Sequence, residues 1–164
     1  MPIRKILVAV DGSDPSYNAS TYAIDFAKRN EAELIVLCIV SHVPYSQFDY
    51  ANNDRTKKIE TIEKEKAEHE IIDKVKQKAT EQKVSVNTDV IIGITSVVKE
   101  IVEYAENKKV DMIVIGSRGM TGFKKLLLGS VTSGVVTYSH CPVLVVKWPS
   151  LCYPTVKTIL CVFS

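Results

Sequence analysis

Four glycines, followed at once by a serine, are spaced as a loop that could hold a phosphate group. They lie just after an apolar run, and they are Gly116, Gly119, Gly122 and Gly129. Glycine lets the backbone approach a ligand closely, and the first N–H groups of a helix attract anions. A helical pattern begins at Ser130, whose hydroxyl could cap it. The order strand, glycine loop, helix start therefore predicts a phosphate-binding loop; the alternative is a turn that only reverses the chain.

The common nucleotide-binding fingerprints do not fit this loop. No Gly-Lys-Ser or Gly-Lys-Thr closes it, and its spacing is not that of a dinucleotide motif. The spacing Gly-x2-Gly-x9-Gly-Ser, which starts at Gly116, instead resembles the nucleotide-binding motif of the universal stress protein family. Residues 6–13, Ile-Leu-Val-Ala-Val-Asp-Gly-Ser, resemble the opening strand of the same family, with its Asp at the carboxyl end.

The resemblance implies an ATP site. It assigns phosphate contacts to Gly119, Gly129, Ser130 and Val131, and it places Gly122 and Thr132 in the same nucleotide site. The path along ribose and phosphates is assigned to Gly116, Ser117 and Arg118, and the ribose or adenine to Asp11. Ala9 and Ile39 would bracket the adenine. Asp11 could instead only cap a turn, and Ile39 could be only core. A Mg²⁺ ion would arrive with the phosphates, because no carboxylate pair marks a dedicated metal site.

Five strand-like runs alternate with four helical patterns, which predicts an α/β fold. The expected strands are 3–10, 33–40, 84–90, 111–115 and 142–147, and the expected helices are 14–30, 57–82, 96–107 and 130–139. Asp14 is expected to cap the first helix, and the second is expected to carry an imperfect apolar stripe that includes Ile62 and Ile72. Nearly continuous apolar runs indicate strands buried on both faces of a parallel sheet, whereas the alternation in 84–90 indicates an edge. The prediction is a doubly wound, Rossmann-like sheet with helices on both faces. The resemblance implies the strand order 3-2-1-4-5, as in adenine nucleotide alpha hydrolase-like folds, with Asp11 and Gly116 meeting at the switch point.

Size and charge exclude several classes of protein. The chain has 164 residues, 46% of them hydrophobic, and a net charge of +2 with both signs interspersed. We therefore expect one domain over residues 1–148 and no nucleic-acid or membrane partner. None of the four cysteines has metal-ligand spacing, and Cys38 lies in an apolar run as a buried thiol would. Without a signal peptide or a long apolar run, a cytoplasmic location is expected.

Two segments depart from this pattern. Residues 41–56 form a long connection rich in aromatic side chains, which could lie over a ligand or pack locally as a surface insertion. Residues 149–164 form a C-terminal tail, in which 156–164 resembles the first strand, 3–11, without its Asp. This tail is interpreted as the remnant of a second copy of the domain that could pair with a sheet edge; the alternative is a disordered tail.

No catalytic apparatus is visible in the sequence. The three histidines are isolated, and neither a nucleophile elbow nor a Cys/His pair can be identified by spacing. We therefore expect an ATP-binding protein of the stress response with at most slow ATP hydrolysis. The alternatives are an interaction module with an empty crevice and, less favoured, an adenylyl-transferring enzyme. The family resemblance also implies a homodimer, paired through the last strand of the sheet.

Overall fold

A six-stranded sheet forms the centre of the protein, in a computed structural model that describes residues 2–41, 61–62, 65–93, 95–119, 128–147 and 159–162. The strands lie in the order β3-β2-β1-β4-β5-β6. They are β1 Lys5–Val10, β2 Glu33–Ser41, β3 Val86–Gly93, β4 Met112–Gly116, β5 Val143–Val146 and β6 Ile159–Val162. The first five pair in parallel, which confirms the predicted five-stranded sheet, its 3-2-1-4-5 order and the edge position of the third strand.

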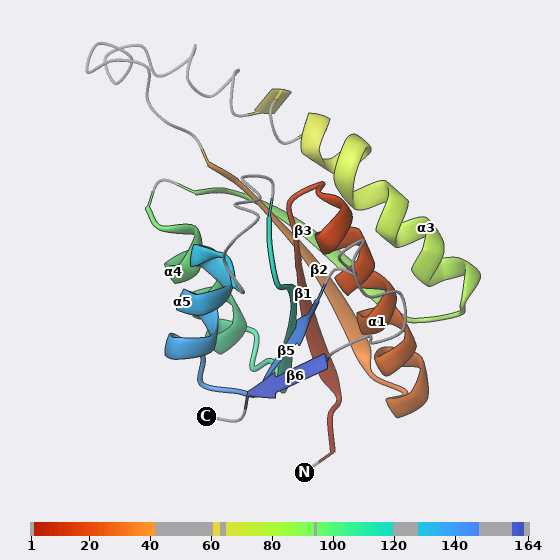
Figure 1. Cartoon of the computed structure of the whole chain (residues 1–164). Helices are drawn as coiled ribbons and strands as arrows, with labels where there is room; N and C mark the ends of the chain where they lie inside the picture. The colour runs from red at the N-terminus through yellow and green to blue at the C-terminus, as the bar shows by residue number, and fades with distance from the viewer. Residues whose placement is uncertain are drawn as a thin grey trace, which may run out of the picture.

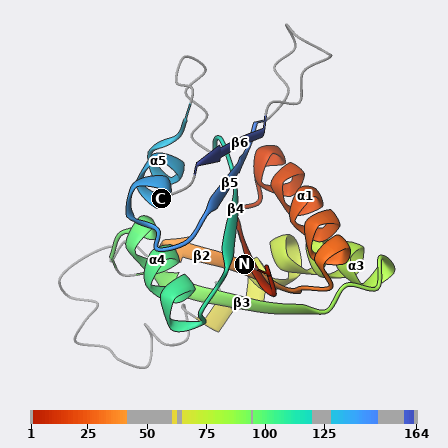
Figure 2. The same cartoon turned by 90° about the horizontal axis from the view of Figure 1, so that it is seen from below.

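Helices cover both faces of this sheet (Figure 1). They are α1 Asp14–Asn30, the π-helical turn η2 Glu68–Ile72, α3 Asp73–Glu81, α4 Val97–Asn107 and α5 Ser130–Tyr138. Side chains alternate along each strand, so one set packs with α1 and α3 and the other with α4 and α5. Figure 2 shows these two helical layers on opposite sides of the sheet. No helix in the described part of the chain has the length and apolarity needed to cross a membrane.

Two local expectations need correction. The cap of α1 is Ser13, not Asp14, because the Ser13 hydroxyl accepts from the N–H of Ser16 while Asp14 already lies in the helix. The expected apolar stripe of the 57–82 helix is only partly buried: Ile62 is 54% exposed, whereas Ile72 is fully buried. The π-helical turn accounts for part of this, since its wider winding shifts the residues before it relative to the 3.6-residue period. The connection 42–60 lies outside the described residues.

The C-terminal tail contributes a strand at the end of the sheet. Its four residues, β6, pair antiparallel with β5 in a register that sets Val143 opposite Val162 and Val146 opposite Ile159. This agrees with the expectation that the tail could pair with a sheet edge. Whether the tail is a remnant of a second copy stays a prediction. The backbone groups that β5 would otherwise leave unpaired are satisfied within the chain.

The helices α4 and α5 approach each other closely at Gly134. A Cβ atom placed on Gly134 would lie 2.7 Å from Cγ2 and 2.9 Å from Cγ1 of Val98. Both atoms belong to a β-branched side chain with little rotamer freedom, so a larger residue at position 134 must push the two helices apart. The glycine therefore sets the separation of the layer that covers this face of the sheet.

We predict that Gly134→Ala destabilises the protein, although alanine is the better helix former by about 1 kcal/mol. Overpacking between the helices should cost about 1–3 kcal/mol of the free energy of unfolding, measured by urea titration. The exposed neighbour on the same helix, Ser133→Ala, is the control and should be nearly neutral. Adding Val98→Ala to Gly134→Ala should recover part of the loss; an unchanged or larger loss in the double variant would contradict the steric explanation.

Candidate functional site

A cavity of about 100 Å³ opens at the carboxyl ends of β1, β2 and β4. β1 and β4 are neighbours in the sheet, but the chain after β1 enters α1 on one face and the chain after β4 leads to α5 on the other. Adjacent strands whose connections diverge in this way leave a crevice at the switch point of the sheet. The fold therefore places a cavity where ligands of open α/β sheets bind.

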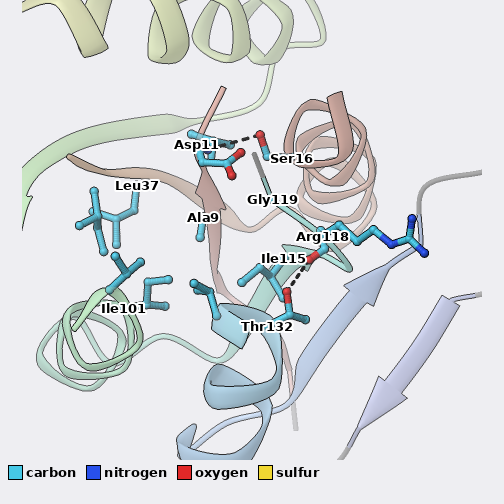
Figure 3. Close-up of a pocket in the computed structure, with 14 residues that line it drawn as sticks. Ala9, Asp11, Ser16, Leu37, Ile101, Ile115, Arg118, Gly119 and Thr132 are labelled. Carbon is cyan, nitrogen blue, oxygen red and sulfur yellow. Dashed lines mark hydrogen bonds between the residues drawn. The ribbon is translucent and has the colours of Figure 1, made fainter. Parts of the chain in front are cut away.

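One wall of the cavity is apolar and belongs to the face covered by α4 and α5 (Figure 3). The strands and the two helices supply its side chains, which are Ala9, Leu37, Ile39, Val97, Ile101, Ile115 and Val131. The helical members come from the first two turns of α4 and the first turn of α5. A flat apolar group, such as an aromatic ring, could bury a face against this wall.

A carboxylate stands at the opposite rim. Asp11 follows β1 directly, and its Oδ1 accepts hydrogen bonds from the N–H of Ser13 at 3.0 Å and from the hydroxyl of Ser13 at 2.6 Å. The N–H of Asp11 donates to Oγ of Ser16 at 3.3 Å, and that hydroxyl donates to the carbonyl of Ser13 at 2.8 Å. These bonds tie the carboxylate to the start of α1, so its direction is set before any ligand arrives.

The connection between β4 and α5 is closed at its base by two hydrogen bonds. The N–H of Gly129 donates to the carbonyl of Ser117 at 2.8 Å. The hydroxyl of Thr132 donates to the carbonyl of Gly116 at 2.7 Å, and this bond is buried. Ser117 is itself held in place, because its N–H donates to the carbonyl of Val146 at 2.8 Å. The start of α5 is thereby fixed against the end of β4.

The first turn of α5 carries no side-chain cap. Its N-cap is Gly129, and the expectation that Ser130 could cap the helix is wrong, because Ser130 is already the first helical residue and is exposed. The N–H groups at the start of a helix have no acceptor within the helix. Val131 and Thr132 line the cavity, so this turn brings the positive end of the helix dipole to its rim.

The glycines of the motif differ in the steric constraints that their surroundings impose. A Cβ on Gly116 would lie 2.9 Å from the carbonyl oxygen of Pro15, so the close approach of α1 to β4 requires glycine there. A Cβ on Gly119 would lie 2.6 Å from Oδ2 of Asp11. At Gly129 the nearest atoms of the described residues would be 3.7 Å away, an ordinary contact, and its φ of −71° suits any residue. The described part of the chain therefore gives no steric reason for glycine at position 129.

Arg118 has its backbone at the cavity, while its side chain extends away from the apolar wall in Figure 3. Its positive charge is therefore not directed into the cavity. Among the described residues, no group of three His, Cys, Asp or Glu side chains is arranged to hold a metal ion.

The buried thiol of Cys38, which lies near Asp11, is unreactive near pH 7. Cys38 lies on β2 opposite Val10, is buried and forms no disulfide. Burial, and then the nearby negative charge of Asp11, raise the pKa of Cys38 to about 11. The thiol therefore stays protonated near pH 7 and is not a nucleophile for the cavity.

Most of the predicted site residues come together in this one cavity. Eight of them line it: Ala9, Asp11, Ile39, Gly116, Arg118, Gly119, Val131 and Thr132. Ser117, Gly129 and Ser130 lie beside it in the connection to α5, and Gly122 lies outside the described residues. Sequence reasoning missed Val10, Ser16, Leu37, Val97, Ile101 and Ile115. The five apolar residues lie in patterns that marked them as core, and only the packing of the helices against the strand ends distinguishes a wall residue from a core residue. Ser16 carried no signal in the sequence.

Comparison with known proteins gives one consistent family. The universal stress protein family matches residues 2–147. Universal stress protein MJ0531 of Methanocaldococcus jannaschii is 40% identical over 146 residues, which cover 89% of this chain and 83% of that protein. The solved structure of protein MJ0577, from the same organism, has a TM-score of 0.78 at 29% identity and covers 92% of this chain and 99% of that one.

A universal stress protein solved in complex with cAMP has a TM-score of 0.61 at 25% identity, covering 88% of this chain and 97% of that one. The matched region includes all the strands that surround the cavity, the loop after β1 and the start of α5. The chain belongs to the universal stress protein family.

Proposed function

We propose that the cavity binds an adenine nucleotide, with ATP as the ligand, and that the protein acts as a nucleotide-dependent binding protein of the stress response. The observation that carries this proposal is the meeting of three kinds of group at one opening. An apolar wall, the fixed carboxylate of Asp11 and the uncapped start of α5 all border the same cavity. They match the three parts of a nucleotide, which are base, ribose and phosphates.

The size of the cavity favours entry of the base alone. Its volume of about 100 Å³ is smaller than the roughly 300 Å³ at which pockets for drug-sized ligands begin. Ala9 and Ile39 flank the apolar part and are proposed to contact the adenine. Ribose and phosphates then lie at the rim, where Asp11 and the loop after β4 stand. The cAMP-bound relative supports an adenosine-containing ligand.

The phosphates are assigned to the connection between β4 and α5. Gly129 is glycine although its backbone angles, and the described residues around it, would accept a side chain. A ligand that approaches the backbone closely explains that choice. Together with the N–H groups of Ser130 and Val131, it forms the anion site expected at a helix start. Gly119, Gly122 and the backbone of Ser117 and Arg118 complete the proposed path, and Gly116 supports it from the end of β4.

Binding is proposed as the main activity, with ATP hydrolysis at most slow. No His lies among the described residues of the cavity, and the Cys38 thiol stays protonated. Mg²⁺ is proposed to come with the phosphates and to be held mainly by them and by water. When bound, the ion neutralises phosphate charge. The protein's own contribution is to orient the nucleotide through the wall, Asp11 and the first turn of α5. A cytoplasmic location is part of the same proposal.

Two copies are proposed to pair at the β5 end of the sheet. The β5 strand is short, apolar and buried in the chain as it stands, and an uncovered strand edge of this kind pairs readily with another chain. Because β6 is paired with that edge, two copies can meet in one of two ways. They pair through the outer edge of β6, or β6 detaches from β5 and the two β5 edges pair. Removal of the tail should abolish the first kind of dimer and favour the second.

We predict that Gly129→Val strongly weakens ATP binding measured by calorimetry, and that Gly129→Ala weakens it about tenfold, since the new side chain stands where the phosphates approach. Thermal melting without ligand should change little for the alanine variant, because a Cβ fits there. Adenosine, which lacks phosphates, should bind both the natural protein and the alanine variant alike. Equal ATP affinity in all three proteins would overturn the phosphate assignment.

The same titrations separate the alternatives. Absence of ATP binding by the natural protein would favour an interaction module with an empty crevice. Release of AMP and pyrophosphate from labelled ATP would favour an adenylyl-transferring enzyme. Retained, unchanged ATP supports the proposed binding function.

We predict that Asp11→Asn lowers the affinity for ATP about tenfold, because a carboxylate accepts hydroxyl hydrogen bonds more strongly than an amide does. The amide oxygen can still accept from Ser13, so the loop should keep its shape. The control is the ligand: 2′,3′-dideoxy-ATP has no ribose hydroxyls and should bind both proteins equally. An equal loss for both ligands would assign Asp11 to the loop and not to the ribose.

We predict a dimer by multi-angle light scattering at tens of micromolar, both for the full chain and for a chain that ends at Lys147. The shortened chain should dimerise more tightly, because the edge of β5 is then uncovered. A dimer of the full chain that is lost on shortening would place the contact on β6. Monomers in both cases would refute pairing at this end of the sheet.

A further inference from the structure

We propose that Thr132 is a positioning residue of the nucleotide site, whose hydroxyl holds the first turn of α5 in place instead of bonding the ligand. This inference rests on the proposed nucleotide function and refines it. The family resemblance placed Thr132 among the residues of the nucleotide site. The structure uses its hydroxyl for a different purpose, because that hydroxyl donates at 2.7 Å to the carbonyl of Gly116, sixteen residues earlier.

The bond is unusual for a threonine in a helix. A threonine hydroxyl in a helix commonly donates to the carbonyl three or four residues before it in the same helix; Thr137 does so in α5, donating to Ser133 at 2.8 Å. Thr132 instead reaches out of the helix to the end of a strand. Its side chain is 3% exposed, so loss of the donor would leave the Gly116 carbonyl without this partner in a buried place.

The acceptor is a rigid anchor. Gly116 ends β4, all of whose residues are buried, and it pairs with Val146 of β5 in the sheet. On its other side it lies against Pro15 of α1, with no room for a side chain. A group that bonds the carbonyl of Gly116 is therefore held in a fixed position relative to the centre of the sheet and to α1. The turn that orients Asp11 lies at the start of the same helix.

Two bonds bracket the proposed phosphate contacts. One joins the N–H of Gly129 to the carbonyl of Ser117, and the other joins the hydroxyl of Thr132 to the carbonyl of Gly116. Ser130 and Val131 lie between these two bonds along the chain. With both bonds present, the helix start has a fixed position relative to the cavity; with only the first, it can tilt about Gly129. Anion binding by aligned N–H groups depends on that alignment, so the second bond should affect affinity for phosphates without touching them.

The test compares Thr132→Val with Thr132→Ser by calorimetry with ATP. Valine keeps the shape and removes the donor, so ATP affinity should fall about tenfold. Serine keeps the donor and should stay within about twofold of the natural protein. Adenosine affinity should change by no more than about twofold in either variant, because the base wall and Asp11 are not altered. A merely structural role would lower the affinity for both ligands together.

A matched control lies at the other end of the same helix. Ser139 is also buried, and its hydroxyl donates to the carbonyl of Cys141 at 2.9 Å and accepts from the Cys141 N–H at 3.2 Å. Ser139→Ala should lower the melting temperature about as much as Thr132→Val does, yet leave ATP affinity unchanged. If Ser139→Ala weakens ATP equally, general destabilisation explains the loss and the proposal is overturned.

Hydrogen exchange without nucleotide gives a second, independent measurement. Thr132→Val should speed exchange of the Gly129 and Ser133 N–H groups, which bond to Ser117 and to Gly129, and should spare the Ser139 N–H, which bonds to Val135. If the natural protein binds no ATP, the nucleotide function fails, and exchange alone then decides on Thr132. Unchanged exchange at Gly129 and Ser133, or unchanged ATP affinity in a protein that binds ATP, overturns the positioning role.

Discussion

The parallel pairing of β1 with β4 is the constraint on which the rest of the structure depends. It brings Ile6, Leu7 and Val8 beside Met112, Ile113 and Val114, segments separated by more than a hundred residues. Both strands are buried on both faces, so burial of apolar surface holds them together. The helices that follow them, α1 and α5, lie on opposite faces, so the chain diverges at the carboxyl ends of the two strands. The cavity is a direct consequence of this pairing.

The polar groups around that gap are already organised in the ligand-free chain. Asp11 is held by Ser13, and the start of α5 is held by Gly116 and Ser117. In the described part of the chain, every buried side-chain nitrogen or oxygen has a hydrogen-bond partner. A site built in this way loses little conformational entropy when it binds a ligand, because its groups are ordered beforehand.

The sequence was sufficient for the sheet but not for the wall of the cavity. Continuous apolar runs such as Leu34–Cys38 can be satisfied only by burial on both faces, so strand type and order followed from pattern and family resemblance. Leu37 and Ile101 belong to such runs too, and nothing in their residue type separates a wall position from a core position. The tail strand was visible as a run that resembles β1, but residue patterns do not determine its antiparallel pairing with β5.

The positions of the helix caps are a second feature that residue types alone do not determine. Ser13, Asp14 and Ser130 are all good capping residues, and composition cannot choose between neighbours. Ser13 is the cap of α1, and its hydroxyl also donates to Asp11. The same hydrogen bonds that orient the carboxylate therefore fix the start of α1. At Ser130 the same residue type lies one position inside its helix, and the cap is a glycine.

The positions of the glycine motif are therefore occupied by glycine for different physical reasons. Gly116 is required by the backbone carbonyl of Pro15, so it would be needed in a protein of this fold even without a ligand. A side chain at Gly119 would instead displace the carboxylate of Asp11. Gly129 meets neither constraint: its φ is ordinary, and no described residue would contact its Cβ closely. A motif match at the first two positions is evidence for the packing of α1 and the loop around the switch point. The third position is the one that we assign to the ligand on steric grounds, because no described residue there would contact a new Cβ more closely than 3.7 Å.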